Sequence, residues 1–148
     1  MVALVRDVRT NEPRAIHRTV LTADGRKAEV GGQSRLSLGP VGGGAVKITP
    51  DEQVTLCIGV GEGIESALSL RLAPEFGASP VWGLLSQGQL RAFPILAGIE
   101  SLWIAVDYDH AGIKAAHACA ARWQVAGAEV HLVQPIAAGA DLNDLAHA

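Results

Sequence analysis

The residues best suited to chemistry are acidic and amide side chains that follow apolar segments. Glu62 lies in GVGEGIESALSL, directly after the run VTLCI, and Asp107 and Asp109 follow the run SLWIAV. Asp141 and Asn143 add oxygen donors near the end of the chain. Carboxylate and amide oxygens bind hard divalent cations such as Mg²⁺. The sequence therefore predicts a metal site, provided that the fold brings these segments together.

The glycines around Glu62 could instead belong to a phosphate-binding loop. A dinucleotide-binding fingerprint would need glycines at positions 59, 61 and 64, but Ile64 stands at the third of these. A P-loop would end in Gly-Lys-Ser or Gly-Lys-Thr, which this segment lacks. Glu62 would also repel a phosphate unless a cation lay between them. We therefore predict that the glycines allow a tight turn that presents the carboxylate.

Asp107 and Asp109 are separated by one residue, so in an extended segment both side chains point to the same side. Two close carboxylates raise each other's pKa unless a cation compensates, so the pair suits a divalent metal. An alternative stays open, in which Asp109 caps the next helix and Asp107 is merely exposed. Asp141 could likewise cap a short terminal helix.

Two patterns of secondary structure meet near residue 50. The first part predicts an antiparallel meander: strands VALVRDV and AIHRTVLT, a hairpin turn at Asp24-Gly25 with the return segment RKAEV, and a strand AVKI. From residue 51, the apolar strands VTLCIGV, PVWGLLS, SLWIAVDYD and EVHLVQP alternate with helical spacing at residues 64–72 and 111–126. The segment LRAFPIL is weak and interrupted by proline. This alternation predicts a mostly parallel α/β sheet flanked by helices, with ligands beyond the carboxyl ends of its strands.

Composition limits the class of protein. The chain has 148 residues, 49% of them hydrophobic, which suffices for one buried core. No apolar run reaches the roughly 18 residues of a bilayer span, and no signal-peptide pattern is seen. We therefore expect a cytoplasmic protein without membrane contact, whose Cys57 and Cys119 are buried thiols. Residues 1–50 carry eight basic and four acidic side chains, whereas residues 51–148 carry four and eleven.

Taken in order, these segments resemble the toprim domain, the metal-binding module shared by bacterial-type primases, topoisomerases of types IA and II, and several nucleases. The matching segments are GEGIESAL, AVDYDHAGIKAA and HLVQPIAAGADLNDL. Residues 1–50 are similar, more loosely, to the β-rich segment that precedes the toprim core in primases of phages and mobile elements. The resemblance implies a Rossmann-like toprim domain at residues 51–148, preceded by a small β-rich segment at residues 1–50.

The resemblance also implies an activity. It points to a primase-like nucleotidyltransferase that makes short RNA primers on single-stranded DNA from ribonucleoside triphosphates, with Mg²⁺ or Mn²⁺ as cofactor. Glu62, Asp107 and Asp109 would be catalytic and would bind metal together with Asp141 and Asn143, Glu62 being either a ligand or the general base. A replicative helicase or another replication protein is implied as a partner. Two alternatives stay open, a toprim-type nuclease and a non-catalytic nucleic-acid-binding module.

Further residues are assigned around this predicted site. Four basic residues of the first part are predicted to contact template phosphates: Arg18, Arg26, Arg35 and Lys47. Each could equally be an ordinary solvated strand residue. By resemblance or by adjacency to the acidic pair, four more residues are predicted to line the site: Ser86, Gly88, His110 and Lys114.

Overall fold

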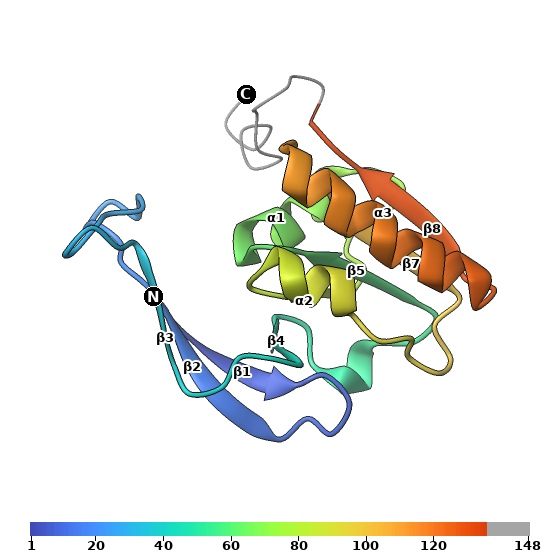
Figure 1. The fold of residues 1–148 in the computed structure, drawn as a ribbon, viewed down its shortest axis with the longest axis horizontal. Helices are drawn as coiled ribbons and strands as arrows, with labels where there is room; N and C mark the ends of the chain where they lie inside the picture. Colours follow the sequence, from blue (N-terminus) through green and yellow to red (C-terminus); the bar gives the residue numbers. More distant parts are fainter. Residues whose placement is uncertain (136–148) are drawn as a thin grey trace.

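A computed structural model describes residues 1–135 of the chain (Figure 1). Its centre is one eight-stranded sheet with the strand order β3-β2-β1-β4-β6-β5-β7-β8. The strands are β1 (Val2–Asp7), β2 (Pro13–Thr19), β3 (Arg35–Leu38), β4 (Gly44–Lys47), β5 (Cys57–Gly61), β6 (Val81–Gly83), β7 (Ser101–Ala105) and β8 (Glu129–Val133). The helices are α1 (Ile64–Ser69), α2 (Gln87–Ala92) and α3 (His110–Val125), with short 3-10 turns η1 (Asp51–Gln53) and η2 (Leu70–Leu72).

The sheet is antiparallel in its first half and parallel in its second. β1 pairs antiparallel with β2 and β4, and β2 pairs antiparallel with β3. β5 pairs parallel with β6 and β7, and β7 pairs parallel with β8. β4 joins the halves, because it pairs antiparallel with both β1 and β6. The predicted α/β fold with a β-rich N-terminal segment is confirmed, and the division after residue 50 stays a prediction.

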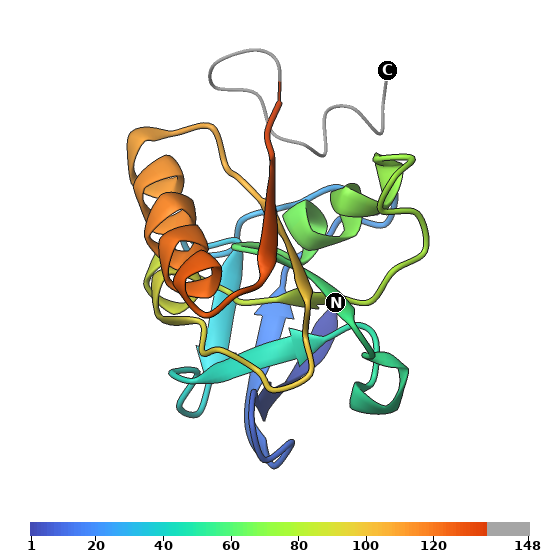
Figure 2. The same ribbon diagram turned by 90° about the vertical axis from the view of Figure 1, so that its right-hand side faces the viewer.

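Helices cover the parallel half on both faces (Figure 2). Alternate residues of β5 and β7, such as Ile58 and Ile104, pack on the face that carries α2 and α3. Ala105 lies on the opposite face and joins a cluster with Ala67 of α1. This division follows from the two-residue period of a strand, which sends successive side chains to opposite faces. None of the helices in residues 1–135 combines the length and the apolar character that crossing a bilayer requires.

The hairpin predicted at Asp24-Gly25 forms, but it is short. Gly25 forms the turn with φ 85°, and an antiparallel bridge joins Leu21 to Lys27 of the return segment. The Ala28 amide also donates to the Val20 carbonyl at 3.0 Å across this turn. β2 itself pairs with β3, which the sequence pattern did not single out. In this pairing the leucines of β3 lie beside β2 on one face of the sheet. Arg35 and Ser37 of β3 lie on the other face, where Arg35 pairs with Glu65 and Ser37 contacts His17.

The segment LRAFPIL contributes to a helix that the sequence pattern missed. Gln87–Ala92 forms α2, and the Ser86 hydroxyl accepts a hydrogen bond from the Gln89 amide at 3.2 Å as its N-cap. Leu90 of α2 is buried in the core. Phe93, which directly follows the helix, stacks on Trp123 of α3 at 5.7 Å between ring centroids. Only six residues long, the helix gives too few turns for a helical period to stand out.

Candidate acidic site

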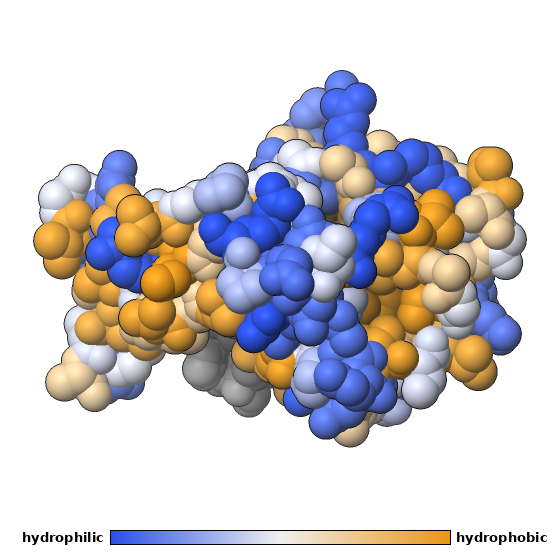
Figure 3. Space-filling model, turned by 90° about the horizontal axis from the view of Figure 1, so that it is seen from below, coloured by the Kyte–Doolittle hydropathy of each residue, from blue (hydrophilic) through white to orange (hydrophobic). Residues whose placement is uncertain are grey.

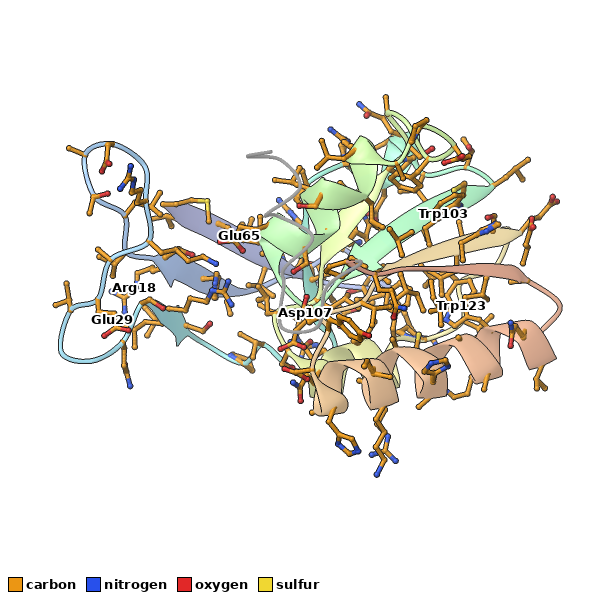
Figure 4. All side chains as sticks on the ribbon, turned by 90° about the horizontal axis from the view of Figure 1, so that it is seen from above. Arg18, Glu29, Glu65, Trp103, Asp107 and Trp123 are labelled. Atoms are coloured by element: carbon orange, nitrogen blue, oxygen red, sulfur yellow. The ribbon has the colours of Figure 1, made fainter. Side chains whose placement is uncertain are left out.

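The acidic residues lie where two neighbouring parallel strands end. Gly61, the last residue of β5, pairs with Ala105, the last residue of β7. Glu62 follows Gly61 directly, and Asp107 follows Ala105 by two residues. Figure 4 shows Asp107 at this end of the sheet, between α1 and the start of α3. The topology therefore brings Glu62 and Asp107 to one edge, as the order of strands and helices predicted.

The glycines near Glu62 act by close packing rather than by an unusual backbone conformation. Gly59, Gly61 and Gly63 all have φ outside the left-handed region. A Cβ on Gly61 would lie 2.6 Å from the amide nitrogen of Ala67, in α1. Glycine at this position lets α1 approach the end of β5 closely. The predicted tight turn is thus replaced by a tight strand-to-helix contact, which still places Glu62 at the rim.

Glu62 lies in a setting that opposes its negative charge. Its Oε2 atom is buried and has no hydrogen-bond partner among residues 1–135. Burial raises the pKa of Glu62 to about 7, and the charges of Asp107 and Asp109 act in the same direction. Arg35 and the side chain of Gln87 oppose this rise in pKa without cancelling it. A cation bound beside Glu62 would relieve the repulsion among the three carboxylates.

Asp107 and Asp109 have different local roles. The Ser66 hydroxyl of α1 donates a hydrogen bond to Asp107 Oδ1 at 2.9 Å. Asp109 Oδ1 accepts the Gly112 amide at 2.7 Å and caps α3. The alternative in which Asp109 is a helix cap is therefore correct for that residue, whereas Asp107 is half-buried and bonded to α1. Capping uses one carboxylate oxygen of Asp109 and is compatible with a metal contact by the other.

An acidic residue of α1, Glu65, ties the helix to the antiparallel half of the sheet. Glu65 forms ion pairs with Lys27 at 3.1 Å and with Arg35 at 3.2 Å. Burial alone would raise the pKa of Glu65, but its own backbone amide and these two cations outweigh burial and lower it. Glu65 is therefore ionised at neutral pH, and it holds Arg35 close to Glu62. The sequence analysis missed this role for Glu65, Lys27 and Ser66, because each depends on contacts between distant segments.

The four predicted phosphate-binding residues do not share one surface. Arg35 lies beside the acidic site, in a small hollow that Glu62 also lines. Arg18 is exposed on the opposite face of the antiparallel strands, since it pairs with Leu36 rather than with Arg35. Arg26 is exposed on the turn after β2, 3.2 Å from Asp24. Of these three residues, only Arg35 adjoins the acidic site.

Lys47 is withdrawn from solvent, which argues against its predicted contact with nucleic acid. Its side chain is 3% exposed, and its ammonium group lies 2.8 Å from Asp51. The same group lies 4.4 Å from the ring centroid of Trp82, a favourable cation–π geometry. β4 is central in the sheet, and a lysine there requires such partners. Lys47 is therefore placed to stabilise the sheet rather than to contact nucleic acid.

The remaining predicted site residues are distributed around the same end of the sheet. Ser86 caps α2, and Gly88 is exposed in the first turn of that helix. His110 and Lys114 are exposed on the first turns of α3. Asp141 and Asn143 lie outside the residues that the structure describes. Within residues 1–135, no three His, Cys, Asp or Glu side chains are gathered as a ready metal site.

The fold and the site define an α/β protein with carboxylates at the ends of adjacent parallel strands. The toprim domain family matches residues 57–148, more than half of the chain, and the chain belongs to that family. Residues 1–48 match a family described as a domain of unknown function (DUF7146). No curated protein matches the chain.

Three solved structures of primases share the fold. The primase fragment of the bacteriophage T7 primase-helicase protein is 19% identical, with a TM-score of 0.64 over 99% of this chain and 57% of that one. A DNA primase domain from Pseudomonas aeruginosa is 17% identical, with a TM-score of 0.55 over 98% and 52%. The Aquifex aeolicus primase, with its zinc-binding and RNA polymerase domains, is 18% identical, with a TM-score of 0.57 over 99% and 36%. This chain therefore spans between about a third and three fifths of the length of those chains.

Proposed function

We propose that this chain is the catalytic core of a metal-dependent, primase-like nucleotidyltransferase that makes short RNA primers on single-stranded DNA. One observation carries the proposal: Glu62 and Asp107 meet at the carboxyl ends of β5 and β7, and Glu62 has a buried oxygen without a partner among residues 1–135. The shared fold with primase structures supports this choice of substrates. Because the T7 relative is part of a primase-helicase protein, we extend the proposal to a helicase as partner.

The donor atoms fit Mg²⁺ or Mn²⁺. Mg²⁺ is commonly held by one or two protein carboxylates, with water and substrate phosphates completing its shell. Glu62 and Asp107 supply such carboxylates, and Asp109 adds a third close enough to raise the pKa of Glu62. Asp141 and Asn143 remain proposed as further ligands. When bound, the cation would neutralise charge on the transferred phosphoryl group and polarise it.

The protein residues have separate roles in the proposed reaction. The 3′-hydroxyl of the growing primer attacks the α-phosphorus of a ribonucleoside triphosphate, and pyrophosphate leaves. Glu62 serves either as a further ligand of the cation or as the base that takes the proton from that hydroxyl. Arg35 contacts a phosphate from its position beside Glu62. Ser66 fixes the orientation of Asp107 through its hydrogen bond.

The test is a primer-synthesis assay with the full chain, a single-stranded DNA template, labelled ribonucleoside triphosphates and Mg²⁺ or Mn²⁺. We expect short RNA products from the wild type and a loss of at least about a hundredfold in Asp107→Asn. Glu100→Gln is the matched control, because Glu100 is exposed and precedes β7 at the opposite end of the same strand. Its product yield should equal that of the wild type.

Other outcomes would replace the proposal. Shortening of the DNA in place of primer synthesis, again lost in Asp107→Asn, would indicate a toprim-type nuclease. Binding of the oligonucleotide without either reaction, unchanged in Asp107→Asn and in Asp109→Asn, would indicate a non-catalytic binding module.

A further inference from the structure

One face of the sheet is covered over only part of its width. α1 packs across the other face, where Ile64 joins Val5, Ala15 and Val46 in a cluster that links both halves. On the first face, α2 and α3 cover the parallel strands through residues such as Phe93. In the part of the chain that the structure describes, no helix continues this layer over β1, β2 and β3 (Figure 1). The layer therefore ends where the antiparallel strands begin.

The uncovered strands present aliphatic side chains instead of the polar residues expected of a solvated face. Strand pairing arranges them in two rows across the three strands. The first row is Leu38, Ile16 and Leu4, and the second row is Leu36, Arg18 and Val2. Their exposed fractions are 67% for Leu38, 39% for Ile16, 42% for Leu4, 39% for Leu36 and 70% for Val2. We call these six residues the open aliphatic face, and Figure 3 shows apolar side chains gathered at this end of the molecule.

The charge on this face is positive. Arg18 stands in the middle of the second row, and no ion pair or hydrogen bond of its side chain is found within residues 1–135. The Asp7 carboxylate pairs with the neighbouring Arg14 at 2.7 Å, so Asp7 is not a partner of Arg18. An arginine surrounded by aliphatic side chains gains most from a carboxylate that arrives with an apolar surface.

We propose that the open aliphatic face binds an amphipathic helix of a partner protein, with a carboxylate of that helix paired to Arg18. The axes of the two outer strands of a three-stranded sheet lie about 10 Å apart. This distance matches the diameter of one helix, which is roughly 10 Å. The two rows lie two residues apart, about 7 Å along the strands, close to the ~6 Å rise of four helical residues. The docked helix therefore places apolar residues on the first row and Asp or Glu one turn away, on Arg18. This inference does not depend on the proposed enzymatic function.

Two other occupants fit the same surface less well. A second copy of the chain would bring two Arg18 side chains into the interface, and the open aliphatic face contains no carboxylate to pair with them. A nucleic-acid strand would find one cation and no aromatic side chain on which a base could stack. Five aliphatic side chains around one arginine match an apolar helix with an acidic residue.

The test uses a displayed library of amphipathic helical peptides selected against the immobilised full chain. We expect the enriched peptides to carry apolar residues at i, i+3 or i+4, and i+7 with Asp or Glu one turn away. Binding, measured by fluorescence anisotropy, should weaken at least about tenfold in Leu38→Ser and in Arg18→Glu. Exchanging the peptide carboxylate for lysine should restore binding to Arg18→Glu. Both substitutions lie at exposed positions, so thermal unfolding should show an intact fold.

Two controls match these variants in chemistry but lie elsewhere. Val125→Ser removes an apolar side chain that is 91% exposed on α3, and Arg26→Glu reverses a charge on the turn after β2. Neither should change the affinity. The proposal is overturned if selected peptides lack an acidic preference or bind Leu38→Ser as well as the wild type. Light scattering and binding assays test the other occupants. The proposal is also overturned if the wild type self-associates, or binds oligo(dT) or phosphatidylglycerol vesicles, and Leu38→Ser abolishes that association or binding.

Discussion

At the scale of single residues, Glu62 is the most informative group in the protein. Its carboxyl group is held where burial and two neighbouring carboxylates disfavour ionisation, which raises its pKa to about 7. In the metal-free protein such a group tends to keep its proton, and it releases that proton when a cation binds. The same feature links metal affinity, proton release and stability at a single position.

The raised pKa of Glu62 predicts a pH-dependent effect of Glu62→Gln on stability. The folded protein holds the proton up to about pH 7, whereas the unfolded chain loses it near the ordinary glutamate pKa of 4.5. The native state therefore binds more protons between these values, and its stability falls as pH rises through them. The full shift corresponds to about 3 kcal/mol, and solvent screening of the half-buried carboxyl group reduces this. In EDTA, Glu62→Gln should therefore be more stable than the wild type by on the order of 2 kcal/mol at pH 8, and nearly equal at pH 4. Urea unfolding at both pH values measures this, and a pH-independent difference would contradict it.

Ser66 is predicted to matter through Asp107. Ser66→Ala removes the hydroxyl that donates to Asp107 Oδ1 at 2.9 Å, so the carboxylate loses an orienting contact. We expect Mn²⁺ affinity, measured by electron paramagnetic resonance, to fall about tenfold. Ser69→Ala is the matched control, because Ser69 is also buried in α1 but its hydroxyl donates to the Glu65 carbonyl. Equal Mn²⁺ affinity in Ser66→Ala and wild type would show that this hydrogen bond does not position Asp107 for metal.

At the scale of elements, the site depends on how closely α1 approaches β5. Gly61→Ala would place a methyl group 2.6 Å from the Ala67 amide nitrogen, so the helix or the strand must shift. We expect a loss of unfolding free energy of about 1–3 kcal/mol, together with weaker metal binding. Gly42→Ala is the control, since no atom lies within 4 Å of the added carbon and its φ is not positive. Chemical denaturation of both variants measures the effect, and similar stabilities would count against the close-packing explanation.

Much of this arrangement could be predicted from local pattern. Apolar strands alternating with helical spacing implied parallel pairing, and the ends of parallel strands meet at one edge, so Glu62 and Asp107 could be placed together. Contacts between distant segments could not be predicted. The ion pairs of Glu65 with Lys27 and Arg35 depend on where the loop after β2 folds back. The burial of Lys47 follows from the central place of β4, which no local pattern encodes.

At the scale of the whole molecule, charge is divided between the two faces of the antiparallel strands. Arg35 lies on the side of the acidic site, and Arg18 lies on the open aliphatic face. If single-stranded DNA passes the acidic site, only the first arginine should contact it. These two arginines of residues 1–50 therefore do not lie on one surface.

This division predicts different salt dependences for two arginine variants. Arg35→Ala should weaken oligo(dT) binding and lower the slope of log affinity against log salt by about 0.7, the loss of one phosphate contact to a single strand. Arg18→Ala should leave both the affinity and the slope unchanged. Fluorescence anisotropy titrations between low and moderate salt provide the measurement. The reverse result would place the DNA on the open aliphatic face and would also contradict the docking proposal.

The position of β4 has a consequence for how the molecule unfolds. This strand pairs with β1 on one side and with β6 on the other, so its loss would expose unpaired backbone groups in both halves at once. The antiparallel and parallel halves should then melt in a single cooperative transition, with equal calorimetric and van't Hoff enthalpies. A ligand held at either half would stabilise the other to the same degree.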